Sequence, residues 1–87
     1  MSDELAARFT EAQEQVKTLT TRPSNEDLLQ LYALFKQGTV GDVQGKRPGM
    51  MDFKGRAKHD AWAGKKGMTQ AEAQEGYVAL VARLLGG

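Results

Sequence analysis

The chain has 87 residues, of which 40% are hydrophobic, and a formal net charge of +1. This length predicts one domain over residues 1–87 with a single apolar core, and the lack of cysteine excludes disulfides, thiolate catalysis and thiolate metal sites. The first 19 residues are charged and amphipathic, and no apolar stretch is long enough to span a membrane. We therefore expect a cytoplasmic protein with no integral membrane association. We also expect it to be a monomer.

Positive charge is concentrated in the middle third of the sequence. Residues 1–35 carry three basic and six acidic side chains, residues 36–66 carry eight and three, and residues 67–87 carry one and two. In a nearly neutral protein this distribution favours an anionic partner of limited size over an extended polyanion. A solvated lysine-rich face is the alternative interpretation of the same charge run.

Apolar residues near the start of the chain recur at three- and four-residue spacing. They are Leu5, Phe9, Ala12, Val16 and Leu19. This spacing predicts an amphipathic helix, with Ser2 as its cap and the acidic Asp3 and Glu4 suited to its N-terminus.

A second helix is predicted after the interruption at Pro23. Its apolar stripe comprises Leu28, Leu31, Tyr32 and Phe35. Ser24 and Asp27 form an imperfect capping box at its start, and the pattern predicts an end near Gln37.

The periodic pattern fails between residues 38 and 51. The residues that interrupt it are Gly38, Gly41, Gly45, Pro48 and Gly49. We expect a loop of roughly a dozen residues here, and loops of that length are usually functional.

A third helix is predicted from the cap Asp52, with Phe53, Ala57 and Ala61 on one stripe and an end at residues 64–67. Gly55 inside this helix lowers helix stability by about 1 kcal/mol relative to alanine. Close approach of another backbone or of a ligand would explain why a glycine stands at this position.

The fourth helix begins with a better capping box, Thr69 and Glu72. Its apolar stripe comprises Ala73, Tyr77, Leu80, Val81 and Leu84, followed by the terminal Gly86 and Gly87. The sequence thus predicts an all-α protein without strands. Short connections after the first and third helices predict antiparallel neighbours, whereas the long second connection can leave helices two and three roughly parallel.

Two aromatic rings and a lysine share one side of the second helix. Tyr32, Phe35 and Lys36 stand at i, i+3 and i+4, an arrangement that can stack a base and pair with a phosphate. Core aromatics with a lysine at their edge are the alternative interpretation.

Lysines also share one rim of the third helix. Lys54 and Lys58 are one turn apart. Lys17 on the first helix and Tyr77 on the fourth could complete a site with them.

Several short motifs follow one another through the middle of the chain. They are Tyr32-x-x-Phe35-Lys36-Gln37, Thr39-Val40-Gly41-Asp42, Arg47-Pro48-Gly49-Met50, Asp52-Phe53-Lys54-Gly55-Arg56-Ala57-Lys58 and Asp60-Ala61-Trp62. Their order and spacing resemble the acyl-coenzyme A binding protein (ACBP) family. The resemblance extends over almost the whole chain through Phe9, Val16, Lys17, Leu19, Pro23 and Tyr77.

The resemblance implies a four-helix, up-down-down-up bundle with a long loop between helices two and three. It implies non-catalytic binding of long-chain fatty acyl-coenzyme A, as an intracellular pool former or carrier that needs no cofactor. The ligand-binding residues that it implies are Lys17, Tyr32, Phe35, Lys36, Lys54, Lys58 and Tyr77. Tyr32 and Lys36 would contact the 3′-phosphate region. Phe35 would stack on adenine, and Lys58 would support the nucleotide.

The chain departs from the family pattern at three positions. The family usually has tyrosine where this chain has Phe35, tryptophan where it has His59, and alanine where it has Gly38. We expect loss of a polar contact at the first position, weaker acyl-chain contact or an altered chain-length preference at the second, and a loosened helix end at the third. For the neighbouring pair Met50 and Met51, plain packing is favoured over contact with an acyl chain.

Neither catalysis nor a metal site is predicted. His59 is the single histidine, and its neighbour Asp60 points about 100° away from it on a helix. Two other functions remain open from the sequence pattern. One is a nucleic-acid-binding module, since proteins that bind single strands also use basic segments with aromatic residues. The other is a helical protein-interaction domain. The expected partner is acyl-coenzyme A and not a nucleic acid.

Overall fold

A computed structural model describes residues 3–86, and over these residues the chain forms helices and no strand. The α-helices are α1 (Asp3–Gln15), α2 (Asn25–Thr39), α3 (Phe53–Ala63) and α4 (Gln70–Gly86). The all-α prediction is confirmed. The predicted cap Ser2 and the terminal Gly87 lie outside the described residues.

The first predicted helix is shorter than its apolar pattern. After α1 the chain tightens into a single 3₁₀ turn, η1 (Val16–Thr18), and Leu19 has an extended backbone. Such tightening is common at helix C-termini, where the last carbonyls lack partners.

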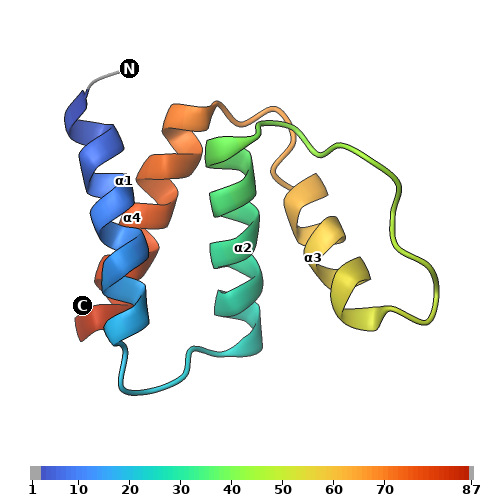
Figure 1. The fold of residues 1–87 in the computed structure, drawn as a ribbon, viewed down its shortest axis with the longest axis horizontal. Coiled ribbons are helices and arrows are strands. Elements are labelled where there is room, and N and C mark those ends of the chain that lie inside the picture. Colours follow the sequence, from blue (N-terminus) through green and yellow to red (C-terminus); the bar gives the residue numbers. More distant parts are fainter. Residues whose placement is uncertain (1–2, 87) are drawn as a thin grey trace.

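The helices follow the predicted up-down-down-up order (Figure 1). Helix α4 lies between α1 and α2 and packs against both, whereas α3 packs against α2 and forms one edge of the molecule. The result is a flat body with Cα extents of 38 × 32 × 16 Å. Consecutive helices joined by short connections run antiparallel, as predicted, but the expectation that they are neighbours is wrong for both pairs. Helix α4 occupies the space between α1 and α2, and α2 lies between α3 and α4.

The core lies between α1, α2 and α4. Its buried apolar residues are Phe9, Ala12, Leu31, Leu34, Ala73, Tyr77 and Val81. The ring of Phe9 meets Tyr77 edge to face at a centroid distance of 5.2 Å and lies 6.1 Å from Phe35. Edge-to-face contact is a favoured arrangement for aromatic pairs, so these rings join all three helices.

Local capping begins three of the helices as the sequence predicts. Ser24 Oγ accepts from Asp27 N at 3.1 Å, and the Asp52 carboxylate accepts from Gly55 N at 2.9 Å. At α4 the capping is reciprocal: Thr69 N donates to Glu72 Oε1 at 2.9 Å, and Glu72 N donates to Thr69 Oγ1 at 3.0 Å. The bonds that Glu72 makes with Thr69 lower the pKa of its carboxyl group.

Gly38 lies inside α2, which continues past the predicted end at Gln37. A Cβ at this position would lie 3.1 Å from Gln74 Cγ and 3.3 Å from Phe9 Cζ. In addition, Gln74 Nε2 donates to the carbonyl of Gly38 at 2.9 Å. The prediction of a loosened helix end here is therefore wrong: the missing side chain lets α4 approach α2 closely.

Two residues of α3 lie differently from the expectation. A Cβ at Gly55 would overlap the carboxylate of Asp52, so the group that closely approaches this glycine is the N-cap side chain and not another backbone. Phe53, predicted on the packed stripe, is 75% exposed. The buried apolar residue of α3 is Trp62, about two and a half turns from the helix start, where α3 packs against α2.

The long loop over residues 40–52 is fixed near its beginning by the Asp42 carboxylate. Asp42 Oδ1 accepts from Gln37 Nε2 and from Gly67 N, both at 2.9 Å. Gln37 is fully buried and also donates to the carbonyl of Met68 at 2.8 Å. This network joins the end of α2 to the connection before α4.

Further along, the loop is held to α3 by an ion pair. Arg47 Nε and Nη2 donate to the two carboxylate oxygens of Asp60 at 2.9 and 2.7 Å. The guanidinium lowers the pKa of Asp60. Because both side chains are about half exposed, the pair orients the loop more than it stabilises the fold.

Candidate functional site

Two adjacent hollows lie on either side of Tyr32 and Leu28. The first, of about 350 Å³, is lined by Val16, Lys17, Leu19, Pro23, Leu28, Leu31, Tyr32, Phe35 and Tyr77. The second, of about 680 Å³, is lined by Arg22, Asn25, Leu28, Leu29, Tyr32, Phe53, Lys54, Ala57 and Lys58. Since Tyr32 and Leu28 belong to both, one elongated molecule can extend from one hollow into the other.

The structure brings six of the seven predicted site residues to these hollows. Lys17, Phe35 and Tyr77 line the first hollow, and Lys54 and Lys58 line the second. The sixth, the shared Tyr32, lies between the two groups.

Lys36 is the predicted residue that lines neither hollow. Its Nζ lies 5.0 Å from the ring centroid of Trp62 on α3, a distance typical of a cation–π contact. On α2 it follows Tyr32 by one helical turn, so its long side chain shares the side of the helix on which Tyr32 lies.

The aromatic rings of the first hollow belong partly to the core. Phe35 packs against the core and lies 6.4 Å from Tyr77, centroid to centroid. Tyr77 is buried, and this burial raises the pKa of its hydroxyl, so the phenol stays neutral at physiological pH. The rings of Phe35 and Tyr77 thus pack in the core, as the alternative interpretation predicts for core aromatics, and they also present surface to the hollow.

Lys17 supplies the positive charge of the first hollow. Its Nζ lies 3.2 Å from Glu14 Oε2, and both side chains are highly exposed. An exposed pair of this kind contributes little to stability. The ammonium group can therefore turn from Glu14 to an anionic ligand at small cost.

The second hollow combines an apolar lining with a cationic rim. Lys58 Nζ lies 5.5 Å from the ring centroid of Tyr32, and the lining includes Leu28, Leu29, Phe53 and Ala57. The cations of the rim are Arg22, Lys54 and Lys58. This combination suits a molecule with an anionic part and an apolar part.

Sequence reasoning missed Arg22 and Asn25 in this lining. Arg22 Nη1 donates to Asn25 Oδ1 at 3.3 Å where the chain enters α2. Arg22 belongs to the connection before Pro23 and carries no helical periodicity. Only the return of the chain at this turn brings it to the same hollow as Lys54 and Lys58.

The methionine pair is also placed differently from the prediction. Met50 and Met51 are 77% and 88% exposed, so the packing interpretation is wrong. They are not among the residues that line the two hollows.

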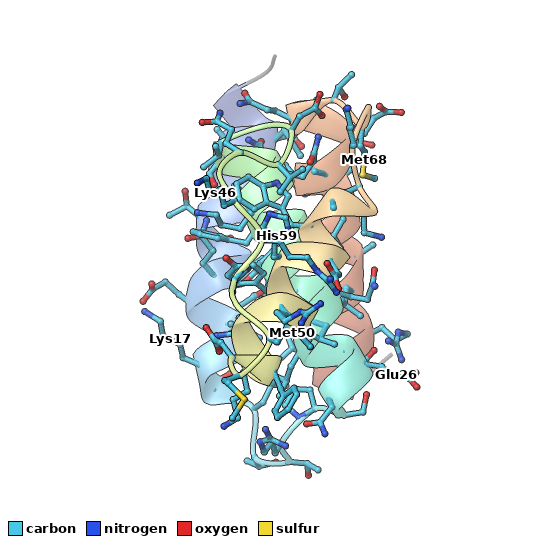
Figure 2. The ribbon with its side chains drawn as sticks, turned by 90° about the vertical axis from the view of Figure 1, so that its right-hand side faces the viewer. Lys17, Glu26, Lys46, Met50, His59 and Met68 are labelled. Carbon is cyan, nitrogen blue, oxygen red and sulfur yellow. The ribbon has the colours of Figure 1, made fainter. Side chains whose placement is uncertain are left out.

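His59 lies on α3 behind the long loop, as Figure 2 shows, and does not line either hollow. Both of its ring nitrogens are buried and have no hydrogen-bond partner among the described residues. The nearest carboxylate oxygen, Asp60 Oδ1, is 3.9 Å from Nδ1, which is too long for a hydrogen bond. Contact between this position and an acyl chain thus has no support from the geometry.

Two further features concern the described residues as a whole. In residues 3–86, no group of three or more histidine, aspartate and glutamate side chains is placed to hold a metal ion. None of the helices in that range has both the length and the apolar character needed to cross a membrane.

Comparisons of the sequence and of the structure with known proteins all match acyl-CoA binding proteins. The family model described as acyl CoA binding protein matches residues 6–81. The chain is 58% identical over 77 residues to acyl-CoA-binding protein homolog 1 of Caenorhabditis elegans, covering 88% of this chain and 90% of that protein. It is 53% identical over 77 residues to the acyl-CoA-binding protein of Brassica napus, covering 88% and 84%. The crystal structure of Oryza sativa acyl-CoA-binding protein 2 superposes with a TM-score of 0.91 at 45% identity, covering 94% of this chain and 89% of that one.

Proposed function

Since the chain belongs to the acyl-CoA binding protein family, we propose that its two joined hollows hold the two halves of one fatty acyl-coenzyme A molecule. The protein binds this ligand without transforming it and serves as an intracellular pool former or carrier. The observation that carries the placement is the shared lining by Tyr32 and Leu28, which joins an aromatic hollow to a larger apolar one.

The nucleotide half of the ligand is assigned to the first hollow. Adenine needs an aromatic or apolar surface on which to stack, and Phe35 offers such a surface there. Lys17 lies at the same hollow for a phosphate, and the neutral hydroxyl of Tyr77 does not repel an anion. Lys36, one turn beyond Tyr32, serves the 3′-phosphate by reaching from the Trp62 ring toward the ligand.

The acyl half is assigned to the second hollow. Leu28, Leu29 and Ala57 provide an apolar surface between α2 and α3, and Phe53 extends it at the helix start. The rim cations Arg22, Lys54 and Lys58 surround this surface, where they pair with phosphates of the ligand.

The working unit proposed is a monomer in the cytoplasm, with residues 1–87 as a single acyl-coenzyme A binding domain and no cofactor. We propose one ligand molecule for each chain, since the proposal needs no contact residue from a second copy. The basic charge serves the phosphates of this ligand and not a nucleic acid.

Calorimetric titration with palmitoyl-coenzyme A, free coenzyme A and palmitate tests this function, because it separates the two halves of the ligand. In a series from octanoyl- to stearoyl-coenzyme A, affinity should rise by at most about 0.8 kcal/mol per methylene and then level off where the apolar hollow ends. Higher ionic strength should weaken binding of free coenzyme A and leave the increment per methylene nearly unchanged.

A flat dependence on chain length, together with binding that disappears in salt, would contradict the acyl-coenzyme A assignment. The same titration with a single-stranded oligonucleotide serves as the control for general polyanion binding. We expect no retention of the oligonucleotide at physiological salt.

A further inference from the structure

His59 is a buried titratable side chain that the two ligand hollows do not use. Its side chain is 18% exposed, and among residues 3–86 neither ring nitrogen has a hydrogen-bond partner. A neutral imidazole carries one N–H donor and one acceptor nitrogen. Buried polar groups are normally paired, so two bare nitrogens on one ring require a physical reason. The ring lies on α3 behind the long loop (Figure 2).

The long loop is held to the rest of the fold by few contacts. None of residues 41–52 is buried, so this segment adds nothing to the apolar core. Hydrogen bonds to Asp42 fix its beginning. In the part of the chain that the structure describes, the polar contact that ties residues 43–48 to α3 is the ion pair between Arg47 and Asp60. Segments with so few contacts open at a low free-energy cost.

The carboxylate of that ion pair also lies beside His59. Asp60 Oδ1 is 3.9 Å from His59 Nδ1, and the same oxygen accepts from Arg47 Nε at 2.9 Å. A movement of about 1 Å would bring the imidazole and this oxygen within hydrogen-bond distance. His59 and Arg47 are therefore placed to compete for one carboxylate oxygen.

Protonation changes the balance among the charged groups around this ring. Imidazole groups change charge between about pH 8 and 5, and the protonated ring has two N–H donors. Lys36 Nζ on α2 lies 5.0 Å from the ring centroid of Trp62, which follows His59 by about one turn of α3. The charged groups from the elements packed against the ring are Asp60, Arg56 and Lys58 on α3, Arg47 on the loop and Lys36 on α2.

A protonated ring is poorly accommodated while the loop lies on α3. Of the charged groups around it, Asp60 alone is anionic, and this carboxylate is already bound by Arg47. Release of residues 43–48 takes the guanidinium away from the ring, frees the carboxylate for Nδ1 and admits water to Nε2. Protonation of His59 therefore favours the released loop.

We infer that His59 is a pH-sensitive latch for the middle of the long loop. While the ring is neutral, Arg47 stays paired with Asp60 and residues 43–48 lie on α3. When the ring is protonated, Asp60 turns to His59 and the segment leaves α3, whereas Asp42 keeps the start of the loop in place. The latch lies outside the two hollows, so it does not depend on which ligand they hold.

Nuclear magnetic resonance on the whole chain tests the latch between about pH 8 and 5. In the wild type, backbone order parameters of residues 43–47 should fall from about 0.85 to below about 0.6. The midpoint should coincide with the titration of the His59 ring, the single histidine of the chain. The bond from Arg47 lowers the pKa of the Asp60 carboxyl, so this carboxylate stays ionised over the range and does not itself supply the transition.

Three variants separate the latch from other effects of pH. In His59→Phe, which keeps a ring but cannot gain a proton, residues 43–47 should stay ordered throughout the range. In Arg47→Ala, which lacks the guanidinium, the segment should be mobile at both ends of the range. Lys46→Ala is the matched control, because it removes an exposed cation of the same loop and leaves the ion pair intact. It should respond to pH as the wild type does.

A spin label gives a second readout, because the chain has no cysteine of its own. Attached at Gln44→Cys, an exposed position of the loop, the label should become several-fold more mobile between about pH 7.5 and 5.5. The same label at Ala82→Cys, an exposed position of α4, should keep its mobility.

Three results would overturn the latch: a loop that keeps its order while the His59 ring titrates, a ring that stays neutral down to about pH 5, or an equal loss of loop order in His59→Phe. Far-ultraviolet circular dichroism should stay constant over the same range. A loss of helix at the midpoint of the loop transition would also contradict the proposal, because the loop would then be released by unfolding of the whole protein.

Discussion

The indole Nε1 of Trp62 donates a hydrogen bond to the backbone carbonyl of Gly41, 2.8 Å away and 21 positions earlier in the chain. The same ring lies beneath the ammonium group of Lys36 on α2, 5.0 Å from Nζ to the ring centroid. Trp62 thus fixes the start of the long loop and the position of a proposed ligand-binding lysine. A residue outside the ligand hollows is therefore expected to influence both stability and binding.

Replacement of Trp62 by phenylalanine should destabilise the protein and loosen the loop. The variant keeps an aromatic ring but loses the donor to Gly41, and a buried group left without its partner costs roughly 1–3 kcal/mol. Urea unfolding followed by circular dichroism measures this cost, because the change removes the single tryptophan. Amide exchange in residues 40–46 should accelerate in the native state. Unchanged exchange there would show that the bond does not hold the loop.

Lys36→Ala should weaken binding of acyl-coenzyme A about ten- to a hundredfold. A charge-assisted contact of roughly 1.5–3 kcal/mol is lost, and calorimetry with palmitoyl-coenzyme A measures it. Lys66→Ala is the matched control, because Lys66 is an exposed lysine on the connection between α3 and α4, away from Tyr32 on α2. Equal affinities of a folded Lys36→Ala variant and the wild type would remove the proposed phosphate role.

Asp42→Asn should reduce stability at neutral pH and have less effect in acid. The bond from Gly67 N, and after it the bond from Gln37, lower the pKa of Asp42 below its usual 3.8. The ionised carboxylate therefore stabilises the fold above the unfolded pKa, and this contribution is lost as the pH falls through the lower folded value. The gap in unfolding free energy between the two proteins should narrow from pH 7 to about pH 3. If the difference in unfolding free energy stays constant over this range, the loss of stability in Asp42→Asn does not come from the charge of the carboxylate.

His59→Phe should stabilise the protein without favouring either half of the ligand. Within residues 3–86, both ring nitrogens of His59 are buried without hydrogen-bond partners, so an apolar ring of similar size should raise the free energy of unfolding by roughly 1–2 kcal/mol. Since His59 does not line the hollows, affinities for free coenzyme A and palmitoyl-coenzyme A should change by equal factors. A selective gain for palmitoyl-coenzyme A would place this position at the acyl chain instead.

The elements that depend on neighbouring residues could be predicted from the sequence. The caps at Ser24, Asp52 and Thr69 act over three residues, so their side chains meet the same backbone groups whatever the rest of the fold does. The helical spacing of Tyr32 and Phe35 likewise places both rings at the first hollow. The family resemblance extended this local information to the order of the helices.

The tertiary structure alone decided how segments distant in sequence meet. From the sequence, Gly38 is expected to loosen the end of its helix. In the structure it lies within α2 and lets Gln74 of α4 approach closely. Phe53 belongs to the predicted packed stripe, yet it is 75% exposed, because it lines an open hollow between α2 and α3 instead of packing against α2. Arg22 entered the site through the return of the chain before α2. Periodicity shows which residues share a face of one helix, but burial and site membership depend on which other element covers that face, and long-range packing sets that partner.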